Sequence, residues 1–206
     1  RESASISFAP RLGWRDVPLR DLLAKETGLP VHIENSGRAC AIAQAWGVRR
    51  EEGRSRDFVF LSVSDGLGVG IVVNGEVLRG RHNVAGEFGH VPLAGDGPPC
   101  ACGAVGCWEA YVSTLATLSR YFGRALSPRK PIPAEIASFS VDDLVARARG
   151  GDGKAVAALQ STGRYLGLGL ASVVNAVDPE RIFISGEIIA AWDLVDMDRY
   201  RAAWLS

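Results

Sequence analysis

Four side chains of the kinds that bind transition metals lie close together near the middle of the chain. Three of its four cysteines, Cys100, Cys102 and Cys107, fall in one short segment, and His90 precedes them. Structural zinc sites take four ligands, often three cysteines and one histidine, and thiolates are preferred partners of zinc. The residue types and their spacing therefore predict a structural zinc site with ligands His90, Cys100, Cys102 and Cys107.

A disulfide with one thiol left over is the alternative for these cysteines. The odd number of three disfavours that alternative, as does a cytosolic setting, where thiols stay reduced. Cys100 and Cys102 also stand too close in sequence to pair without strain. We therefore favour the metal, and expect the glycines of the segment to supply the unusual dihedral angles that such a loop requires. These glycines are Gly95, Gly97, Gly103 and Gly106.

The bulk composition excludes some classes of function. The chain has 206 residues with 23 Lys plus Arg and 23 Asp plus Glu, a formal net charge of zero. A surface that binds DNA is usually strongly basic, so we do not expect this stretch to contact DNA. No apolar run reaches a membrane span and no signal peptide opens the chain, which makes a cytoplasmic protein the expectation. The polar start at Arg1 and the end at Ser206, within a helical pattern, suggest part of a longer protein.

The elements that must position the metal ligands follow the order strands, then helices, then one strand. This order predicts an α/β fold with a change of lobe near the middle. Asn74-Gly75 predicts a tight type I′ hairpin, which excludes a purely βαβ arrangement for this half. The predicted strands are 5–9, 31–33, 58–63, 69–73, 76–78 and 181–185, and the predicted helices are 18–28, 39–48, 108–125, 141–149, 152–177 and 198–205.

Two motifs around the metal ligands resemble the signature of the ROK family (repressors, uncharacterised frames and sugar kinases). They are Gly-Glu-Phe-Gly-His at 86–90 and Cys-x-Cys-Gly-x-x-Gly-Cys-x-Glu at 100–109. The resemblance implies the actin-like, ribonuclease-H-like two-lobed ATPase or sugar-kinase fold. It places the end of the N-terminal lobe at 1–54 and the second lobe at 55–206. Further similar positions are Leu12-Gly13-Trp14, Leu29-Pro30-Val31, Glu34-Asn35, Gly75, Gly80 and Asp178-Pro179-Glu180.

The same resemblance implies that Asn35, Glu87, His90 and Glu109 face a sugar. Carboxylates accept strong hydrogen bonds from sugar hydroxyls, and a histidine can bind zinc with one nitrogen and a hydroxyl with the other. The metal then organises the pocket and is not catalytic, since four protein ligands fill its coordination. Taken alone, Glu87 is better explained as a surface carboxylate, and Glu109 as stabilising the start of the helix near Trp108. The surrounding signature favours the sugar-binding role.

The positions that would serve a kinase depart from the family pattern. A kinase of this family carries an Asp directly after Asn35, and this chain has Ser36, a poor base that also suits a helix start. Asp65 adds negative charge to the glycine-rich turn where phosphates would bind. The glycines that resemble phosphate and adenosine motifs, Gly66, Gly68 and Gly186, are weak signals, because any tight turn needs glycine.

We therefore expect the sugar-sensing, zinc-containing domain of a ROK-type transcriptional regulator, without enzymatic activity. DNA would be bound by an N-terminal helix-turn-helix outside this chain, and the protein would form a homodimer or tetramer. The alternative is a sugar kinase acting on a hexose or an N-acetyl amino sugar with ATP and magnesium. A zinc-held structural module without ligand would leave Glu87 and Glu109 unexplained. Gly163, Gly167 and Gly169 permit close packing in the core or at a subunit interface, and the sequence does not choose between these.

Overall fold

The computed structural model describes residues 5–9, 12–48 and 55–195 and divides the chain into two compact units, Arg1–Asn35 and Ser36–Ser206. In the first unit, β1 (Ile6–Ala9) and β2 (Trp14–Val17) form an antiparallel pair, followed by α1 (Leu19–Thr27). Gly28 ends α1 in the left-handed conformation, as expected from the sequence. The predicted strand at 31–33 is wrong, because no described strand pairs with this β-branched segment.

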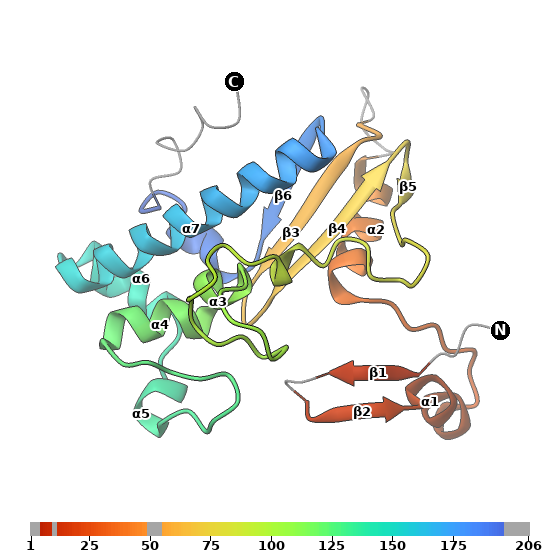
Figure 1. The fold of residues 1–206 in the computed structure, drawn as a ribbon, viewed down its shortest axis with the longest axis horizontal. Coiled ribbons are helices and arrows are strands. Elements are labelled where there is room, and N and C mark those ends of the chain that lie inside the picture. Colours follow the sequence, from red (N-terminus) through yellow and green to blue (C-terminus); the bar gives the residue numbers. More distant parts are fainter. Residues whose placement is uncertain (1–4, 10–11, 49–54, 196–206) are drawn as a thin grey trace. The chain divides into compact units, whose positions relative to one another are not determined.

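The second unit contains a mixed four-stranded sheet (Figure 1). Its strands are β3 (Phe58–Val63), β4 (Leu67–Val73), β5 (Glu76–Val77) and β6 (Arg181–Ser185), in the order β5-β4-β3-β6. β3, β4 and β5 pair antiparallel, whereas β6 runs parallel to β3. Asn74 and Gly75 both have positive φ, at 54° and 82°, which confirms the tight turn between β4 and β5.

Each face of the sheet is covered by one long helix. Successive side chains of a strand point to opposite faces, so both faces of this sheet present apolar side chains that a helix can bury. Val59 and Leu61 face the larger core, which includes Leu166 of α7 (Gly153–Val177). On the other face, Phe58 and Val72 pack with α2 (Ser36–Val48), which begins three residues before the predicted start at 39. The ribbon view shows α2 and α7 on opposite sides of the sheet (Figure 1).

The remaining helices lie between β5 and β6 in sequence. They are α3 (Glu109–Val112), α4 (Thr114–Phe122), α5 (Ala134–Ala137), α6 (Val141–Arg149) and the short 3-10 segment η1 (Phe88–His90). A second 3-10 segment, η2 (Glu187–Ala191), follows β6. The single helix predicted at 108–125 breaks at Ser113, whose extended backbone and hydroxyl begin α4 instead. The helix predicted at 198–205 lies outside the described residues, as does most of the charged segment at 49–57.

The division into units falls before the lobe boundary predicted at residues 54 and 55. α2 belongs to the second unit because it packs closely on β4. A Cβ atom on Gly37 would lie only 2.7 Å from the backbone nitrogen of Val69, so only glycine allows this approach. The boundary between the two lobes of the fold remains a prediction. In the part of the chain that is described, no helix has both the length and the apolar character needed to cross a membrane.

Candidate functional site

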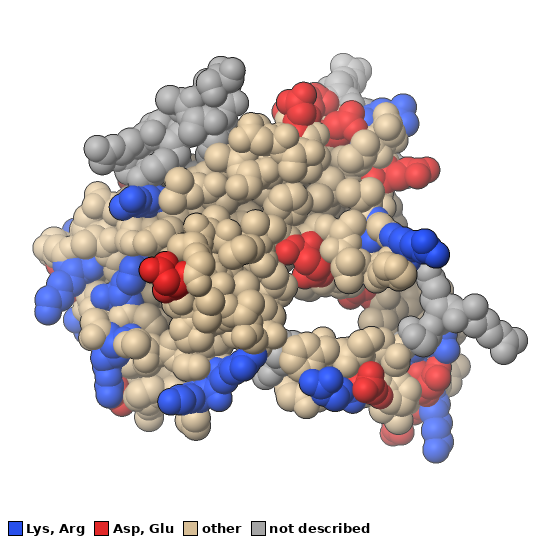
Figure 2. Space-filling model, viewed as in Figure 1, with Lys and Arg blue, Asp and Glu red and all other residues tan. Residues whose placement is uncertain are grey.

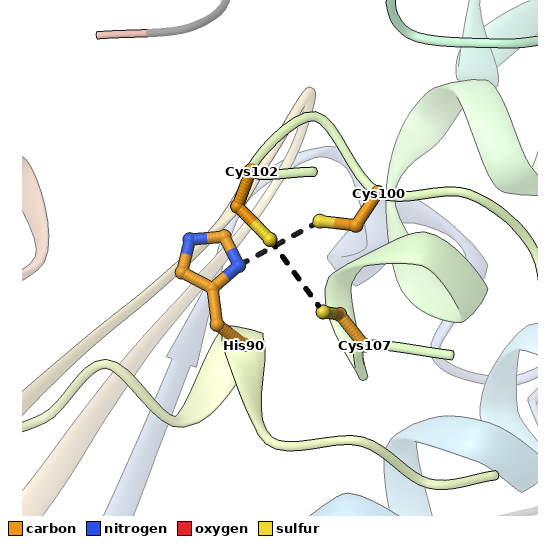
Figure 3. Close-up of side chains that lie close together, drawn as sticks. All are labelled: His90, Cys100, Cys102 and Cys107. Carbon is orange, nitrogen blue, oxygen red and sulfur yellow. Dashed lines mark hydrogen bonds between the residues drawn. The ribbon is translucent and has the colours of Figure 1, made fainter. Parts of the chain in front are cut away.

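The side chains of His90, Cys100, Cys102 and Cys107 converge on one point in the second unit (Figure 3). Their ligand atoms all lie within 4.8 Å of one another, with 3.6 Å between Cys100 Sγ and His90 Nδ1 and 3.7 Å between the sulfurs of Cys102 and Cys107. Tetrahedral zinc with Zn–S bonds of about 2.3 Å separates two sulfurs by roughly 3.8 Å. Donor types and spacing therefore both fit a zinc ion bound by three cysteines and one histidine.

The four cysteines of the chain are free, and the geometry of the cluster excludes a disulfide. A sulfur separation of 3.7 Å far exceeds the bond length of about 2.05 Å. Burial raises the pKa of the Cys100 thiol to about 12 and also raises the pKa of Cys107. Burial opposes ionisation of Cys102 as well, but hydrogen bonds with the Ala104 backbone and the Cys100 side chain lower its pKa overall. A divalent cation must therefore displace protons from at least two thiols.

A short antiparallel pairing of backbone brings the distant histidine to the cysteines. The Trp108 N–H donates to the Val91 carbonyl at 2.9 Å, and the Leu93 N–H donates to the Gly106 carbonyl at 2.8 Å. Cys107 thereby lies opposite Pro92, two residues after His90. Gly106 has φ of 71°, and a Cβ there would overlap the Ala94 carbonyl, so this pairing requires glycine.

The cysteine pair Cys100 and Cys102 sits on a tight turn. The Gly103 N–H donates to the Cys100 carbonyl at 3.2 Å, with φ of 110° at Gly103. The predicted need for unusual glycine conformations is thus confirmed at Gly103 and Gly106. It is wrong at Gly95 and Gly97, which do not have positive φ. Gly97 instead makes room, since a Cβ there would collide with Tyr111.

Two residues that fasten the site to its surroundings were not predicted from the sequence. Trp108, only 1% exposed, donates from Nε1 to the Tyr165 carbonyl at 2.9 Å, and its ring lies against Gly169 of α7. Arg38 of α2, only 6% exposed, donates to the Asn83 carbonyl at 2.8 Å, in the loop before η1. A tryptophan directly after the last cysteine could have indicated a buried contact beside the ligands. Its partners on α7 could not be predicted, because they are far away in sequence.

The predicted sugar-binding carboxylates lie around the start of β4. Glu109, the first residue of α3, accepts a hydrogen bond at Oε2 from the Leu67 N–H at 3.0 Å, and its Oε1 lies 3.9 Å from Cys100 Sγ. Gly89 packs against the same residue, since a Cβ there would lie 2.7 Å from the Leu67 carbonyl. The exposed Glu87 directly precedes η1, whose last residue is His90. Leu67 is therefore the place where the two family motifs meet.

Ser36, at the position where a kinase base is expected, is the first residue of α2. Its hydroxyl lies 3.9 Å from where a Cβ on Gly68 would stand, so it is next to the start of β4. Asn35 is the last residue of the other compact unit and directly precedes Ser36. Ser36 thus lies near the same end of β4 as Leu67, on the face that α2 covers.

Two of the three glycines assigned to a nucleotide site have a structural explanation. Gly66 closes the turn between β3 and β4, where its carbonyl accepts a hydrogen bond from the Ser64 N–H at 3.0 Å. Gly68 faces Gly37 of α2. Gly186 has φ of 105°, and a Cβ there would overlap the backbone of β3. The contacts of Gly68 and Gly186 explain these two glycines without a nucleotide, and the binding role of all three glycines stays a prediction.

Thr114 joins the turn after β3 to the segment after β6. Its N–H donates to the Ser64 carbonyl at 2.9 Å, and its hydroxyl donates to Glu187 Oε2 at 2.9 Å. Asp65 occupies the exposed tip of the same turn. The end of the sheet that would face nucleotide phosphates therefore carries two carboxylates.

Comparison with known proteins gives relatives of two kinds. The model of the ROK family matches residues 1–205. The xylose repressor of Bacillus spizizenii is 31% identical over 195 residues, which are 94% of this chain and 47% of the repressor. The glucokinase of Streptomyces coelicolor is also 31% identical, over 95% of this chain and 63% of that protein. The chain thus spans about half the length of the curated repressors and under two thirds of this glucokinase.

Similar solved structures also include both a kinase and a transcriptional regulator. A ROK family glucokinase from Streptomyces griseus, solved in complex with glucose and AMPPNP, has a TM-score of 0.82 and 30% identity, covering 99% of this chain and 68% of that one. A ROK family transcriptional regulator, a homologue of the E. coli Mlc protein, has a TM-score of 0.77 and 33% identity, covering 98% and 50%. The α/β, actin-like two-lobed fold expected from the sequence is thereby confirmed, and the chain belongs to the ROK family.

Proposed function

We propose that this chain is the sugar-sensing effector domain of a ROK-type transcriptional regulator, stabilised by zinc. The observation that carries the proposal is Ser36, which begins α2 at the place where a kinase of this family carries its general base. A serine hydroxyl is a poor base near neutral pH, and loss of a general base commonly lowers a rate by about 10² to 10⁴. A sensor must bind its sugar but need not deprotonate it, so serine is sufficient there.

The arrangement around the metal cluster supports a role in sugar binding. His90 turns Nδ1 toward the cysteine sulfurs, and its other ring nitrogen faces away from them (Figure 3). That nitrogen is available to a sugar hydroxyl once zinc fixes the ring. Glu109 is held beside the cluster by the Leu67 N–H. Zinc would therefore organise the pocket indirectly, by fixing the ring of His90 and the start of α3.

The region that would face phosphates supports a sensor rather than a kinase. Asp65 at the turn and Glu187 near Gly186 add two negative charges there. Carboxylates repel phosphate groups, most strongly where water is excluded. ATP binding would therefore be weak, although sugar binding would be unaffected.

A sugar kinase using ATP and magnesium is the second candidate. It is favoured by the relatedness to the Streptomyces glucokinases and by the glycines at 66, 68 and 186, which resemble phosphate and adenosine motifs. A kinase would then need another residue to take the proton in place of Ser36. Its substrate would be a hexose or an N-acetyl amino sugar.

The decisive experiment measures ADP release by the intact protein with ATP, magnesium and a panel of sugars that includes glucose, xylose and N-acetyl amino sugars. The sensor proposal expects sugar binding by calorimetry and no turnover. Ser36→Asp supplies the missing carboxylate, and Ser36→Asn is its matched control without a base. Turnover by the unaltered protein would reject the sensor proposal in favour of the kinase.

A second experiment tests the part that zinc plays. Cys102→Ser should lose zinc and sugar binding together, because the loop that holds His90 and Glu109 is no longer fixed. Full sugar affinity in the metal-free variant would refute this role. In the proposed regulator, DNA contact belongs to an N-terminal helix-turn-helix outside this chain, and the protein acts as a homodimer or tetramer.

A further inference from the structure

The loop between α4 and α5 has a defined conformation although it contains little regular structure. At its base, Arg124 and Glu135 form an ion pair of 2.8 Å. At its tip, the Lys130 N–H donates to the Ser127 carbonyl at 3.1 Å, and the Arg129 N–H donates to the Ser127 hydroxyl at 3.3 Å. These contacts form the turn that carries Arg129.

The Arg129 guanidinium lies on the turn that carries two of the metal ligands. It donates to the Ala101 carbonyl from Nη2 at 3.2 Å and from Nε at 3.4 Å. Ala101 stands between Cys100 and Cys102, so the contact lies directly between two ligand residues. A Cβ on Gly103 would lie only 2.7 Å from Nη2, which shows that this glycine provides room for the guanidinium.

The charge of the cluster gives this contact a second consequence. Three thiolates around one divalent cation carry a net charge of −1, since a neutral histidine adds none. The surface view shows basic side chains over the loop between α4 and α5 (Figure 2). Lys130, the next residue, is also basic, but among the described residues the structure records no contact between its side chain and the cysteine turn. Arg129 alone combines the charge with hydrogen bonds to that turn.

We propose that Arg129 is a positioning residue of the metal site: it holds the turn from Cys100 to Gly103 in its metal-binding form and offsets the negative charge of the loaded cluster. This inference rests on the proposed zinc site. Outer residues that orient metal ligands typically change metal affinity by about 10- to 100-fold when removed. Arg129 is exposed, so we expect the low end of this range.

The test measures Zn²⁺ affinity by competition with a chromogenic chelator and follows Co²⁺ by its thiolate charge-transfer and d–d absorption, using the intact protein. Arg129→Ala should lower the affinity of the protein for both ions by about 10-fold. Arg129→Lys retains the charge and one donor and should restore most of the affinity, whereas Arg129→Gln retains a donor without charge and should restore less. Lys130→Ala, the matched control for charge on the same loop, should leave the affinity unchanged.

Several outcomes separate this inference from the proposal beneath it. If the unaltered protein binds Co²⁺ without thiolate absorption bands, the proposed zinc site is refuted. The positioning role of Arg129 is then refuted as well. Tight metal binding that is equal in the unaltered protein and in Arg129→Ala overturns only the role of Arg129. Thermal unfolding of the metal-free proteins distinguishes a local effect from general destabilisation. If Arg129→Ala does not fold, the test compares the metal affinities of Arg129→Lys and Arg129→Gln. Equal affinities in these two variants overturn the contribution of the charge.

Discussion

The metal loop at residues 86–109 and the core formed by β3, β4, β6 and α7 are stabilised in opposite ways. In the core, regular elements bury apolar side chains, and Leu166 and Leu170 of α7 are fully buried in the main hydrophobic cluster. Before α3 begins at Glu109, the only regular element of the loop is the short η1, and the backbone is held by turns, glycines and the four clustered side chains. The core can therefore fold through burial alone, whereas the loop requires its ligands to define one conformation.

The two regions are joined at a few identifiable contacts. Trp108 reaches from the loop into α7, and Glu109 reaches back to Leu67 at the start of β4. A site built on an irregular loop thus acquires rigidity from the core beneath it. The following substitutions separate what each region contributes.

The largest expected effect is the loss of metal from Cys107→Ser, since Cys107 is one of the four clustered ligands and is fully buried. Zinc content measured by atomic emission should fall from about one per chain to none. Amide hydrogen exchange should accelerate across 91–107 and remain slow in α7, because the core does not depend on the metal. Cys40→Ser, outside the cluster, is the control. Equal acceleration in α7 would show that the two regions form one cooperative unit.

The reciprocal substitution is Leu166→Ala in the core. Removing a fully buried leucine typically costs about 2 to 5 kcal/mol of unfolding free energy. The folded fraction should nevertheless retain its zinc, since Leu166 is not a ligand. Chemical denaturation with parallel zinc analysis measures both quantities. Leu168→Ala on the same helix, 43% exposed, should change stability by less than about 0.5 kcal/mol.

Gly169→Ala tests the contact between the regions, because a Cβ there would overlap the Trp108 ring. Overpacking usually costs about 1 to 3 kcal/mol. Displacing Trp108 should in addition weaken metal affinity, as the preceding residue is the ligand Cys107. Gly47→Ala in α2 is the matched control, since nothing lies within 4 Å of its added Cβ. Lower stability with unchanged metal affinity would show that Trp108 does not hold the loop.

The smallest effect is expected at a helix start remote from the metal. Ser140 and Asp143 form a capping box at α6, and Ser140→Ala should cost about 1 kcal/mol. Hydrogen bonds from the Ser140 backbone and hydroxyl hold the pKa of Asp143 below its usual value. The stability from this carboxylate is therefore present above the unfolded pKa and lost as the pH falls through the lower folded value. Denaturation midpoints measured between pH 2 and pH 7 should show that Ser140→Ala loses less stability on acidification than the unaltered protein. Its zinc content at pH 7 should be unchanged. An equal loss of stability in both proteins would contradict this account.

The sequence predicts the regular elements well where hydrophobic periodicity and local signals agree. The bounds of β3, α6 and β6 are as predicted, and α7 begins one residue later because Asp152 is its cap. The break at Ser113 was not predicted, since the apolar pattern continues through it. The strand predicted at 31–33 failed because a strand depends on a partner, which the local pattern does not reveal.

In the candidate site, too, local patterns predicted some features and missed others. The grouping of His90 with the three cysteines was predictable because ligand chemistry and spacing suffice for it. The contacts of Glu109 with Leu67 and of Arg129 with Ala101 were not, since they join segments far apart in sequence. Such contacts depend on how the elements pack, and no local pattern encodes them.

The parallel pairing of β3 with β6 has a consequence for synthesis of the chain. One edge of β3 pairs with β4 almost at once, but its other edge waits for Arg181–Ser185, which follow the metal loop and α7. A nascent chain on the ribosome therefore exposes an apolar strand edge while more than a hundred residues are still being added. Unpaired edges of this kind recruit other strands, and pairing over such distances is slow. Ribosome pausing before β6, or premature termination there, would leave a product prone to aggregation, even though every metal ligand had already been made.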